Sequence, residues 1–251
     1  FNNINYQIEE NINEYFNKNK IFYDLGISVS YDQIFKDISI DSHKEGIINC
    51  HASKLPDYRG RNILNWALIN NESSFGITVH FIDTKIDNGD IIAQKIIDIK
   101  FTDDYKDLLS KAYIECPKLI LDSVNLIIND EIKTIKQIDL SNYPIYCSKR
   151  KEGDEMIDWN NTSLDIYNFI RALVYPGPYA KTIIKGKILF IKKAIYINSA
   201  PLYKDIPGSI LRKDNNGLLV KTGDSYLLIN EWDCDILVKP GDRFNFGTNY
   251  C

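Results

Sequence analysis

The sequence predicts an α/β domain followed by a smaller β-rich domain. Over the first half of the chain, short apolar runs alternate with segments of helical periodicity. After residue 155 the pattern changes to short β-branched runs, which turn signals separate at the spacing of a small barrel. The intervening segment is polar, contains a proline and has weak periodicity, which favours a linker. The predicted limits are therefore 1–138 for the first domain, 139–155 for the linker and 156–251 for the second domain.

The first elements have the order of an α/β unit. A helix is predicted over residues 6–18, and short strands are predicted over 25–31 and 46–50. Pro56 prevents a helix from following the second strand directly, because proline lacks the backbone N–H that a helix interior needs. The chain must therefore turn before the next helix, which is predicted over 62–71.

The rest of the first domain is predicted to be a strand pair and a long helix. Residues 75–82 and 90–99 are β-rich, and an Asn-Gly turn signal lies in the acidic loop between them. The segment 102–128 has an N-capping threonine, an acidic first turn and an apolar stripe, and Pro117 is expected to kink it.

The second domain begins with a short helix and continues as strands. The helix is predicted to end at the Pro-Gly-Pro sequence of residues 176–178. The β-rich runs that follow lie within 180–197, 208–214 and 217–232, and glycine-containing turns separate them. This spacing is typical of a small barrel.

Composition excludes several classes of protein. The 251 residues are 44% hydrophobic and 25% charged, which is enough apolar material for a folded core. The net charge of −4 and a pI near 5.5 make a nucleic-acid partner unexpected. Five cysteines without C-x-x-C spacing indicate neither a zinc site nor a disulfide framework, so we expect a cytoplasmic protein. No apolar run is long enough for a membrane span.

Three polar residues form a candidate catalytic group. Asn49 and His51 are two residues apart at a strand end, so their side chains face the same side, and Asp87 lies in the acidic loop. A neutral imidazole can accept the proton that an attacking amine loses, and a carboxylate beside it stabilises the imidazolium. An asparagine amide can donate a hydrogen bond to a developing oxyanion. Together these groups suit acyl transfer to an amine.

Two other interpretations stay open on the residues alone. A single histidine at a strand end is often a structural residue. His51, His80 and Asp87 could also supply metal ligands, but no ligand spacing repeats in the sequence, so we expect no metal.

A longer stretch resembles a known family. The sequence INCHASKLPDYRGRNILNWALINNESSFGITVHFIDTKIDNGDIIAQ is similar to the signature of the folate-dependent formyltransferases, roughly N-x-H-x-S-x-L-P-x-[YW]-R-G, then G-[IV]-T-[VIL]-H, then D-x-G-x-I. The resemblance extends over about residues 20–130. IDWNNTSLDIYNFIRALVYPGPYA and the sequences after it resemble the family's second domain.

The resemblance implies a fold, a co-substrate and a site. The fold is a Rossmann-like formyltransferase domain followed by a small OB-like domain, and the co-substrate is 10-formyltetrahydrofolate. The family's catalytic residues fall on Asn49, His51 and Asp87. Family analogy places the folate against the following residues: Val29, Ser30, Tyr31, Arg61, and the loop from Asp83 to Asp87. For Arg61 the alternative is an ordinary solvated surface arginine.

Within the family, YRGRNILNWA resembles the nucleotide-sugar N-formyltransferases more than methionyl-tRNA formyltransferase. The expected acceptor is therefore the amine of a nucleotide-linked amino-deoxysugar, in the biosynthesis of a surface polysaccharide such as lipopolysaccharide. The acidic charge agrees, because a tRNA enzyme benefits from a basic surface. The alternatives are methionyl-tRNA formyltransferase and a non-catalytic folate-binding relic. A homodimer is the expected assembly if the chain has a protein partner.

The resemblance also raises an expectation about the start of the chain. Relatives have a strand, a glycine-containing turn, a helix and two more strands before the point where this sequence begins. The sheet is then expected to have an exposed edge, and the chain to be poorly stable or inactive on its own.

Overall fold

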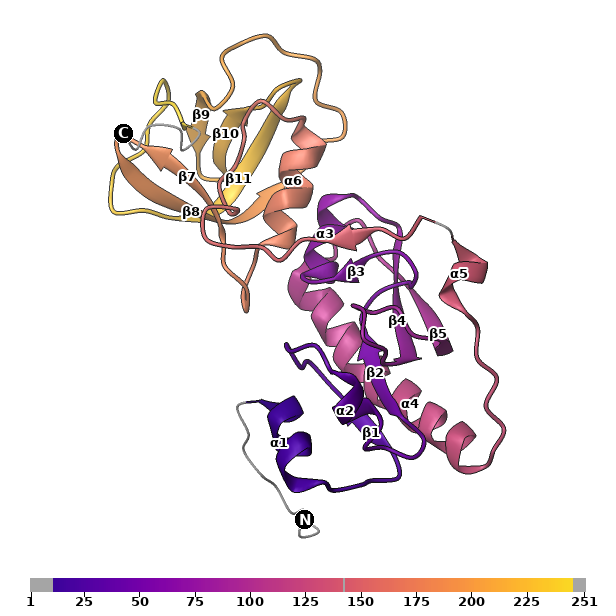
Figure 1. Cartoon of the computed structure of the whole chain (residues 1–251). Coiled ribbons are helices and arrows are strands. Elements are labelled where there is room, and N and C mark those ends of the chain that lie inside the picture. Colours follow the sequence, from indigo (N-terminus) through magenta and orange to yellow (C-terminus); the bar gives the residue numbers. More distant parts are fainter. Residues whose placement is uncertain (1–10, 142, 246–251) are drawn as a thin grey trace. The chain divides into compact units, whose positions relative to one another are not determined.

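The computed structural model describes residues 11–141 and 143–245, and Figure 1 shows the course of the chain. Two compact units are formed, each from three stretches of sequence. The first unit comprises residues 1–61, 75–97 and 112–148, and the second comprises 62–74, 98–111 and 149–251. The domain limits expected from the sequence stay a prediction. Within the described ranges, no helix combines the length and the apolar character that crossing a membrane requires.

A four-stranded sheet forms the first unit, with the strand order β1-β2-β4-β5. β2 pairs in parallel with β1 and antiparallel with β4. The short runs expected over 25–31 and 46–50 are therefore neighbouring strands, although β1 has only three residues. The bounds of the four strands are β1 Gly26–Ser28, β2 Ile47–His51, β4 Ser74–Phe81 and β5 Ile91–Asp98.

The predicted helices are present with changes at their ends, and the sequence does not predict two short ones, α2 and α5. The expectation that Thr102 caps the long helix is wrong, because α4 begins at Tyr105 and the side chain of Asp104 accepts from the backbone N–H of Asp107. Asn11 caps the first helix, because its side chain accepts hydrogen bonds from the backbone N–H groups of Asn13 and Glu14. Residues 6–10 of that predicted helix lie outside the described residues. The helices are α1 Ile12–Asn19, α2 Asp37–Ile40, α3 Ile63–Ile69, α4 Tyr105–Ile128, α5 Gln137–Leu140 and α6 Ser163–Ala172.

The apolar stripe of α4 packs on the sheet of the first unit. Ile48 and Val79, on β2 and β4, are fully buried and pack against Leu119 and Val124 of α4. The alternation along β2 explains this arrangement, since a strand residue with a buried side chain is followed by one on the opposite face. This packing buries the face of β2 that carries Ile48. The opposite face, which carries Asn49, is left for polar contacts.

The segment predicted to be a linker is partly held by the first unit. Its strand β6, Tyr146–Cys147, pairs in parallel with β3, Arg59–Gly60, which follows the turn after β2. Gly60 has a φ of +99°, and a Cβ there would lie 2.5 Å from the carbonyl oxygen of Cys147. Glycine is therefore required for this close approach, which places the backbone of Gly60 beside the loop after β4.

The second unit contains a five-stranded antiparallel sheet, in the order β7-β8-β11-β10-β9. Residues 243–245 join its two edges, because Asn245 pairs with Ile183 of β7 and Arg243 pairs with Ser209 beside β9. The expected β-rich second domain is confirmed, and its sheet is closed in the manner of a barrel. Its strands are β7 Ala180–Ile184, β8 Lys187–Ile195, β9 Ile210–Asp214, β10 Gly217–Lys221 and β11 Tyr226–Asp233.

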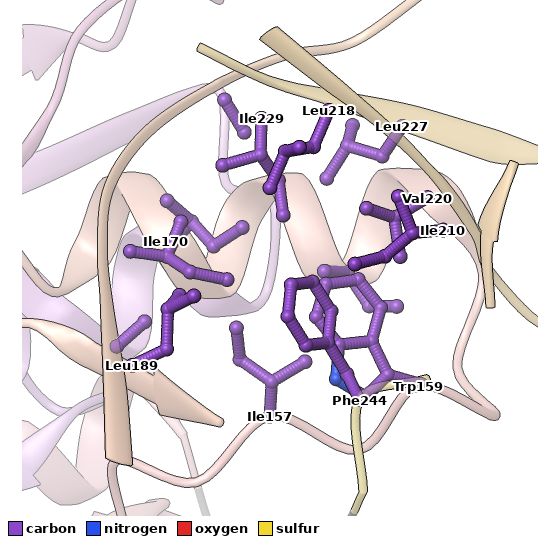
Figure 2. Close-up of a cluster of buried hydrophobic side chains, with 14 of the residues drawn as sticks. Ile157, Trp159, Ile170, Leu189, Ile210, Leu218, Val220, Leu227, Ile229 and Phe244 are labelled. Carbon is purple, nitrogen blue, oxygen red and sulfur yellow. The ribbon is translucent and has the colours of Figure 1, made fainter. Parts of the chain in front are cut away.

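One apolar core supports the second unit. Figure 2 shows the side chains that fill it. Most come from the strands, Ile170 comes from α6, and Ile157, Trp159 and Phe244 come from segments outside these elements. The rings of Trp159 and Phe244 stack with their centroids 5.3 Å apart. The indole N–H of Trp159 donates to Oγ1 of Thr182 over 2.9 Å, so the buried polar atom is satisfied. Phe244 thereby ties the segment that closes the sheet to the core.

Candidate active site

β2 carries two polar side chains on one face at its carboxyl end. Asn49 and His51 alternate with buried or half-buried residues, so they point to the same side of the sheet. The register of the antiparallel neighbour places His80 opposite Asn49 and Thr78 opposite His51. The two strands therefore bring two histidines and an asparagine together.

Asp87 comes to this face from the loop between β4 and β5. Its carboxylate Oδ2 lies 3.6 Å from Nε2 of His51 and accepts a hydrogen bond from the backbone N–H of Gly60 over 2.8 Å. The side chains of His51 and Asp87 are only 12% and 14% exposed. The loop acid therefore faces the imidazole in a partly desolvated setting, where the attraction between opposite charges is stronger than in water.

The contacts of His51 indicate its protonation pattern. Its Nε2 lies 3.0 Å from the carbonyl oxygen of Tyr58, in addition to the Asp87 carboxylate. Both neighbours are acceptors, so Nε2 carries the proton and donates to the carbonyl. In the neutral ring the basic lone pair is then at Nδ1.

His80 lies between Asn49 and Asp87. Its Nδ1 donates to the carbonyl oxygen of Phe81 over 2.7 Å, which leaves the Nε2 lone pair to accept from Nδ2 of Asn49 at 3.3 Å. The same Nε2 is 3.8 Å from Oδ1 of Asp87. Burial lowers the pKa of His80 to about 4, against the opposing effects of the Phe81 carbonyl and Asp87. His80 is therefore neutral near pH 7 and fixes the orientation of the Asn49 amide.

The depressed pKa of His80 predicts a pH-dependent stability. In the unfolded chain this histidine takes up a proton below its ordinary pKa of about 6.5, whereas the folded protein resists protonation down to pH 4. We expect the free energy of unfolding to be fully retained above about pH 7. It should fall between pH 6.5 and 4, by at most about 3 kcal/mol from this group. Urea unfolding at pH 7, 6 and 5 measures it, and His80→Gln should show a shallower pH dependence. Identical pH dependences would contradict the assignment.

The residues expected to contact folate form two groups. Val29, Ser30 and Tyr31 follow β1, and all three are exposed, with Ser30 in the left-handed region at a φ of +53°. The guanidinium of Arg61 donates to the carbonyl oxygen of Asp32 over 2.7 Å, so this arginine is attached to the same loop. An exposed valine, a tyrosine ring and a cation next to one another suit a planar ring system with an anionic tail. Their contact with folate stays a prediction.

Asp83 stabilises the loop that carries Asp87. Its Oδ1 accepts from the backbone N–H of Lys85 over 2.9 Å, and its Oδ2 accepts from Nδ2 of Asn88 over 2.5 Å. Both carboxylate oxygens therefore have partners within the loop. Its predicted contact with folate is untested.

Sequence reasoning did not single out three residues that belong to the site's hydrogen-bond network. His80 and Arg59 fall within the family signature, as the last residue of GITVH and as the arginine of YRG, but the sequence assigns them no catalytic role, and His80 is named only as a possible metal ligand. Gln137 lies outside the signature. Arg59 and Gln137 are almost completely buried, and their contacts join distant segments of the chain. Among the described residues, no group of three or more His, Cys, Asp or Glu side chains could hold a metal ion.

Comparison with known proteins places this site in a family. The formyl transferase family model matches residues 4–124, and the model of the formyl transferase C-terminal domain matches residues 149–235. A methionyl-tRNA formyltransferase from Mycoplasma capricolum subsp. capricolum is 35% identical over 236 residues, which are 92% of this chain and 71% of that protein.

Two solved structures resemble the fold. WlaRD, a sugar 3N-formyltransferase solved in the presence of dTDP and 5-N-formyl-THF, gives a TM-score of 0.67 at 27% identity and covers 87% of this chain and 76% of its own. An N-formyltransferase from Helicobacter canadensis, in complex with folinic acid and dTDP-3-aminofucose, gives a TM-score of 0.66 at 25% identity. The match covers 89% of this chain and 78% of that protein. The chain therefore belongs to the folate-dependent formyltransferases, enzymes that transfer a one-carbon group, and it has both the Rossmann-like and the C-terminal domain of that family.

Proposed function

We propose that this protein transfers a formyl group from 10-formyltetrahydrofolate to the amine of a nucleotide-linked amino-deoxysugar, as a step in surface polysaccharide biosynthesis. The observation that carries the proposal is the meeting of Asn49, His51 and Asp87 at one face of β2. Asp87 Oδ2 lies 3.6 Å from His51 Nε2, and Nε2 of His80, which accepts from the Asn49 amide, lies 3.8 Å from Oδ1 of the same carboxylate. These are the groups that acyl transfer to an amine needs.

Asn49 is proposed to stabilise the negative charge that develops on the formyl oxygen. One N–H of its amide is directed to His80, which holds the amide plane in one orientation. The second N–H of the same group is then available as a donor to the reacting oxygen. Removing one such donor costs about 2.7 to 4 kcal/mol in a well-studied hydrolase.

His51 is proposed to accept the proton that the sugar amine loses as it attacks the formyl carbon. Since Nε2 donates to the Tyr58 carbonyl, Nδ1 is the atom that receives this proton. The imidazolium then faces the Asp87 carboxylate, which favours the charged form. The proton can afterwards pass to the departing folate nitrogen, so the ring returns to its neutral state.

The formyl donor is proposed to bind against Val29–Tyr31, Arg61 and the loop from Asp83 to Asp87, as the family resemblance implies. The donor supplies the activated one-carbon group, and the protein supplies an exposed apolar surface and a guanidinium attached to the Asp32 carbonyl. Two relatives of known structure were solved with the same reduced folate, 5-N-formyl-THF, which is also called folinic acid. This agrees with a folate as the donor.

The charges of residues 149–251, the largest stretch of the second unit, support a small acceptor in place of a nucleic acid. Residues 149–251 contain 15 Lys and Arg against 12 Asp and Glu, which is a small excess for a domain that binds a polyanion. Several of its basic side chains already have carboxylate partners within 4 Å, so their charge is partly neutralised. These ion pairs are Lys181–Glu155, Lys185–Asp242, Lys192–Asp233, Lys193–Glu231 and Arg212–Asp214.

Methionyl-tRNA formyltransferase activity is the second candidate. An identity of 35% to the Mycoplasma capricolum enzyme favours it. The same catalytic trio would serve either acceptor in the proposed mechanism. The two functions differ in the acceptor. A tRNA enzyme must neutralise several phosphates, so its binding should weaken steeply with salt.

One experiment separates the two acceptors. Full-length protein is incubated with 10-formyltetrahydrofolate and either a panel of nucleotide-linked amino sugars or methionyl-tRNA, and the formylated product is measured. We expect product with an amino sugar, tested first on dTDP carriers because two structural relatives were solved with dTDP or a dTDP-linked sugar. Turnover of methionyl-tRNA alone, with binding that weakens as salt increases, would establish the second candidate. Stabilisation by folate without product from any amine would indicate a binding module.

A further inference from the structure

The position of the Asp87 carboxylate depends on the backbone of its loop. Asp87 has a φ of +46°, in the left-handed region that aspartate adopts only occasionally. Gly89 lies so close to β4 that a Cβ there would be 1.9 Å from the carbonyl oxygen of Phe81. The loop is therefore tightly folded, and contacts to its carbonyl groups can move the carboxylate.

Gln137 of α5 makes two of those contacts. Its Nε2 donates to the carbonyl oxygens of Asp87 over 3.0 Å and Gly89 over 2.8 Å. Its Oε1 accepts from Nε of Arg59 over 3.0 Å and from Nη2 over 2.6 Å. The side chain is 3% exposed, and its two donors and two lone pairs are all used.

Arg59 connects the same network to the other side of the loop. It is 4% exposed, and its Nη1 donates to Oδ1 of Asn88 over 2.9 Å and to the hydroxyl of Tyr146 over 3.0 Å. Within the described part of the chain Arg59 forms no ion pair, so neutral oxygens stabilise this buried charge. The next residue, Gly60, donates its N–H to the Asp87 carboxylate.

Asp87 is thus held at both ends. Gly60 binds its carboxylate, and Gln137 binds its carbonyl oxygen. We propose that Gln137 is a positioning residue, which sets the distance between the Asp87 carboxylate and His51 through its amide donors. The inference rests on the proposed function, since it takes Asp87 as the partner of His51. Gln137 itself acts through Asp87 and not on the reacting atoms.

A purely structural role for Gln137 would depend on its carbonyl oxygen Oε1 and not on its Nε2 donors. Gln137 could merely supply an acceptor to the buried guanidinium of Arg59, and its removal would then lower stability. Gln137→Glu keeps that acceptor and loses both amide donors. Gln137→Met has a similar length and loses both functions. The two variants therefore separate positioning of the loop from support of Arg59.

We measure kcat, the KM for the formyl donor and the free energy of unfolding for both variants in the full-length protein. Gln137→Glu should lose about 10- to 100-fold in kcat, because misplacement of a catalytic group by about 1 Å has effects of that size. KM should stay close to wild type, and the free energy of unfolding should fall less than in Gln137→Met, because the carboxylate still accepts from Arg59. Gln137→Met should lose kcat to a similar extent and stability as well. Gln94→Glu is the matched control, since the Gln94 amide donates to Leu55 and Thr78 and not to the Asp87 loop. Its kcat should stay within about threefold.

Several results would overturn the inference. The first is a wild-type kcat in a folded Gln137→Glu protein, provided that Asp87→Asn is inactive. The second is a loss of kcat in Gln94→Glu that equals the loss in Gln137→Glu. If neither Gln137 variant folds, Gln137 is a structural residue and the positioning role is rejected. Full activity of Asp87→Asn would instead reject the roles proposed for the catalytic trio. The failure of the proposed function is therefore distinguishable from the failure of this inference.

Discussion

Replacing His51 with alanine should lower kcat for formyl transfer by about 10³-fold, since a positioned general base contributes about 10²- to 10⁴-fold. The loss follows from removal of the only imidazole that both faces the Asp87 carboxylate and has a free Nδ1 lone pair among the described contacts. The affinity for folate should stay within about threefold, because His51 is not among the residues predicted to contact folate. Steady-state kinetics and folate titration measure the two effects.

His43 provides the matched control for this change. It is half-buried and packs against Phe16 and Tyr23, and its Nδ1 donates to the Ser39 carbonyl oxygen over 2.8 Å. His43→Ala should lower stability without a large change in kcat. Robust turnover in His51→Ala, or equal losses in the two variants, would reject His51 as the proton acceptor.

Asp87→Asn should lower kcat by about 10²- to 10⁴-fold, in the range known for the aspartate of a catalytic triad. Asparagine has nearly the same shape and can keep one oxygen for the N–H of Gly60. The negative charge opposite His51 is lost, so the imidazolium that forms during transfer is less favoured. The loop should therefore keep its structure while the chemical step slows. Single-turnover measurement of formyl transfer isolates that step.

Asp90→Asn is the control for the Asp87 variant. Asp90 lies three residues later in the same connection, and its described contact is a backbone one, from the N–H of Phe81 to its carbonyl oxygen. The variant makes the same change of charge outside the trio and should keep near wild-type kcat. Comparable losses in both would show that the total charge of the loop, and not a specific carboxylate, determines the rate.

Local pattern was sufficient to predict the strand that carries the site. Asn49 and His51 are two residues apart in this strand and therefore share a face, while Ile48 and Cys50 lie on the other face, in the cluster that packs against α4. The Asn-Gly turn located the loop that carries Asp87. Asn49 and His51 lie within this one strand, whereas Asp87 lies much later in the chain, in the loop after β4. That Asp87 belongs with them is expected from the family resemblance and not from the local pattern.

The rest of the site depends on register and on long-range pairing. His80 reaches Asn49 only because β2 and β4 pair with these two residues opposite one another, and a shift of one residue would turn His80 to the other face. Gln137 reaches Asp87 across 50 positions of sequence. Neither contact has a compositional signal, since a buried amide and a buried imidazole resemble surface residues until the fold brings their partners together.

The segment expected to be a solvated linker shows the same limit. Its polar composition and its proline gave no indication that Tyr146–Cys147 would pair with Arg59–Gly60, because two-residue strands are too short for periodicity to reveal. The pairing also holds the backbone N–H of Gly60, which donates to the Asp87 carboxylate.

The closing segment of the second unit also protects the protein in solution. Residues 243–245 supply hydrogen-bond partners to both outer strands of the sheet, and the backbone next to Met156 pairs with Lys181 at the remaining stretch of β7. Unpaired strand edges are templates on which other chains add strands and aggregate. The same short stretch covers both edges, and Phe244 anchors it against Trp159. Detachment of residues 243–245 would therefore expose two unpaired strand edges at once. A chain cut before residue 243 is then expected to precipitate during expression, even though all its strands from β7 to β11 are intact.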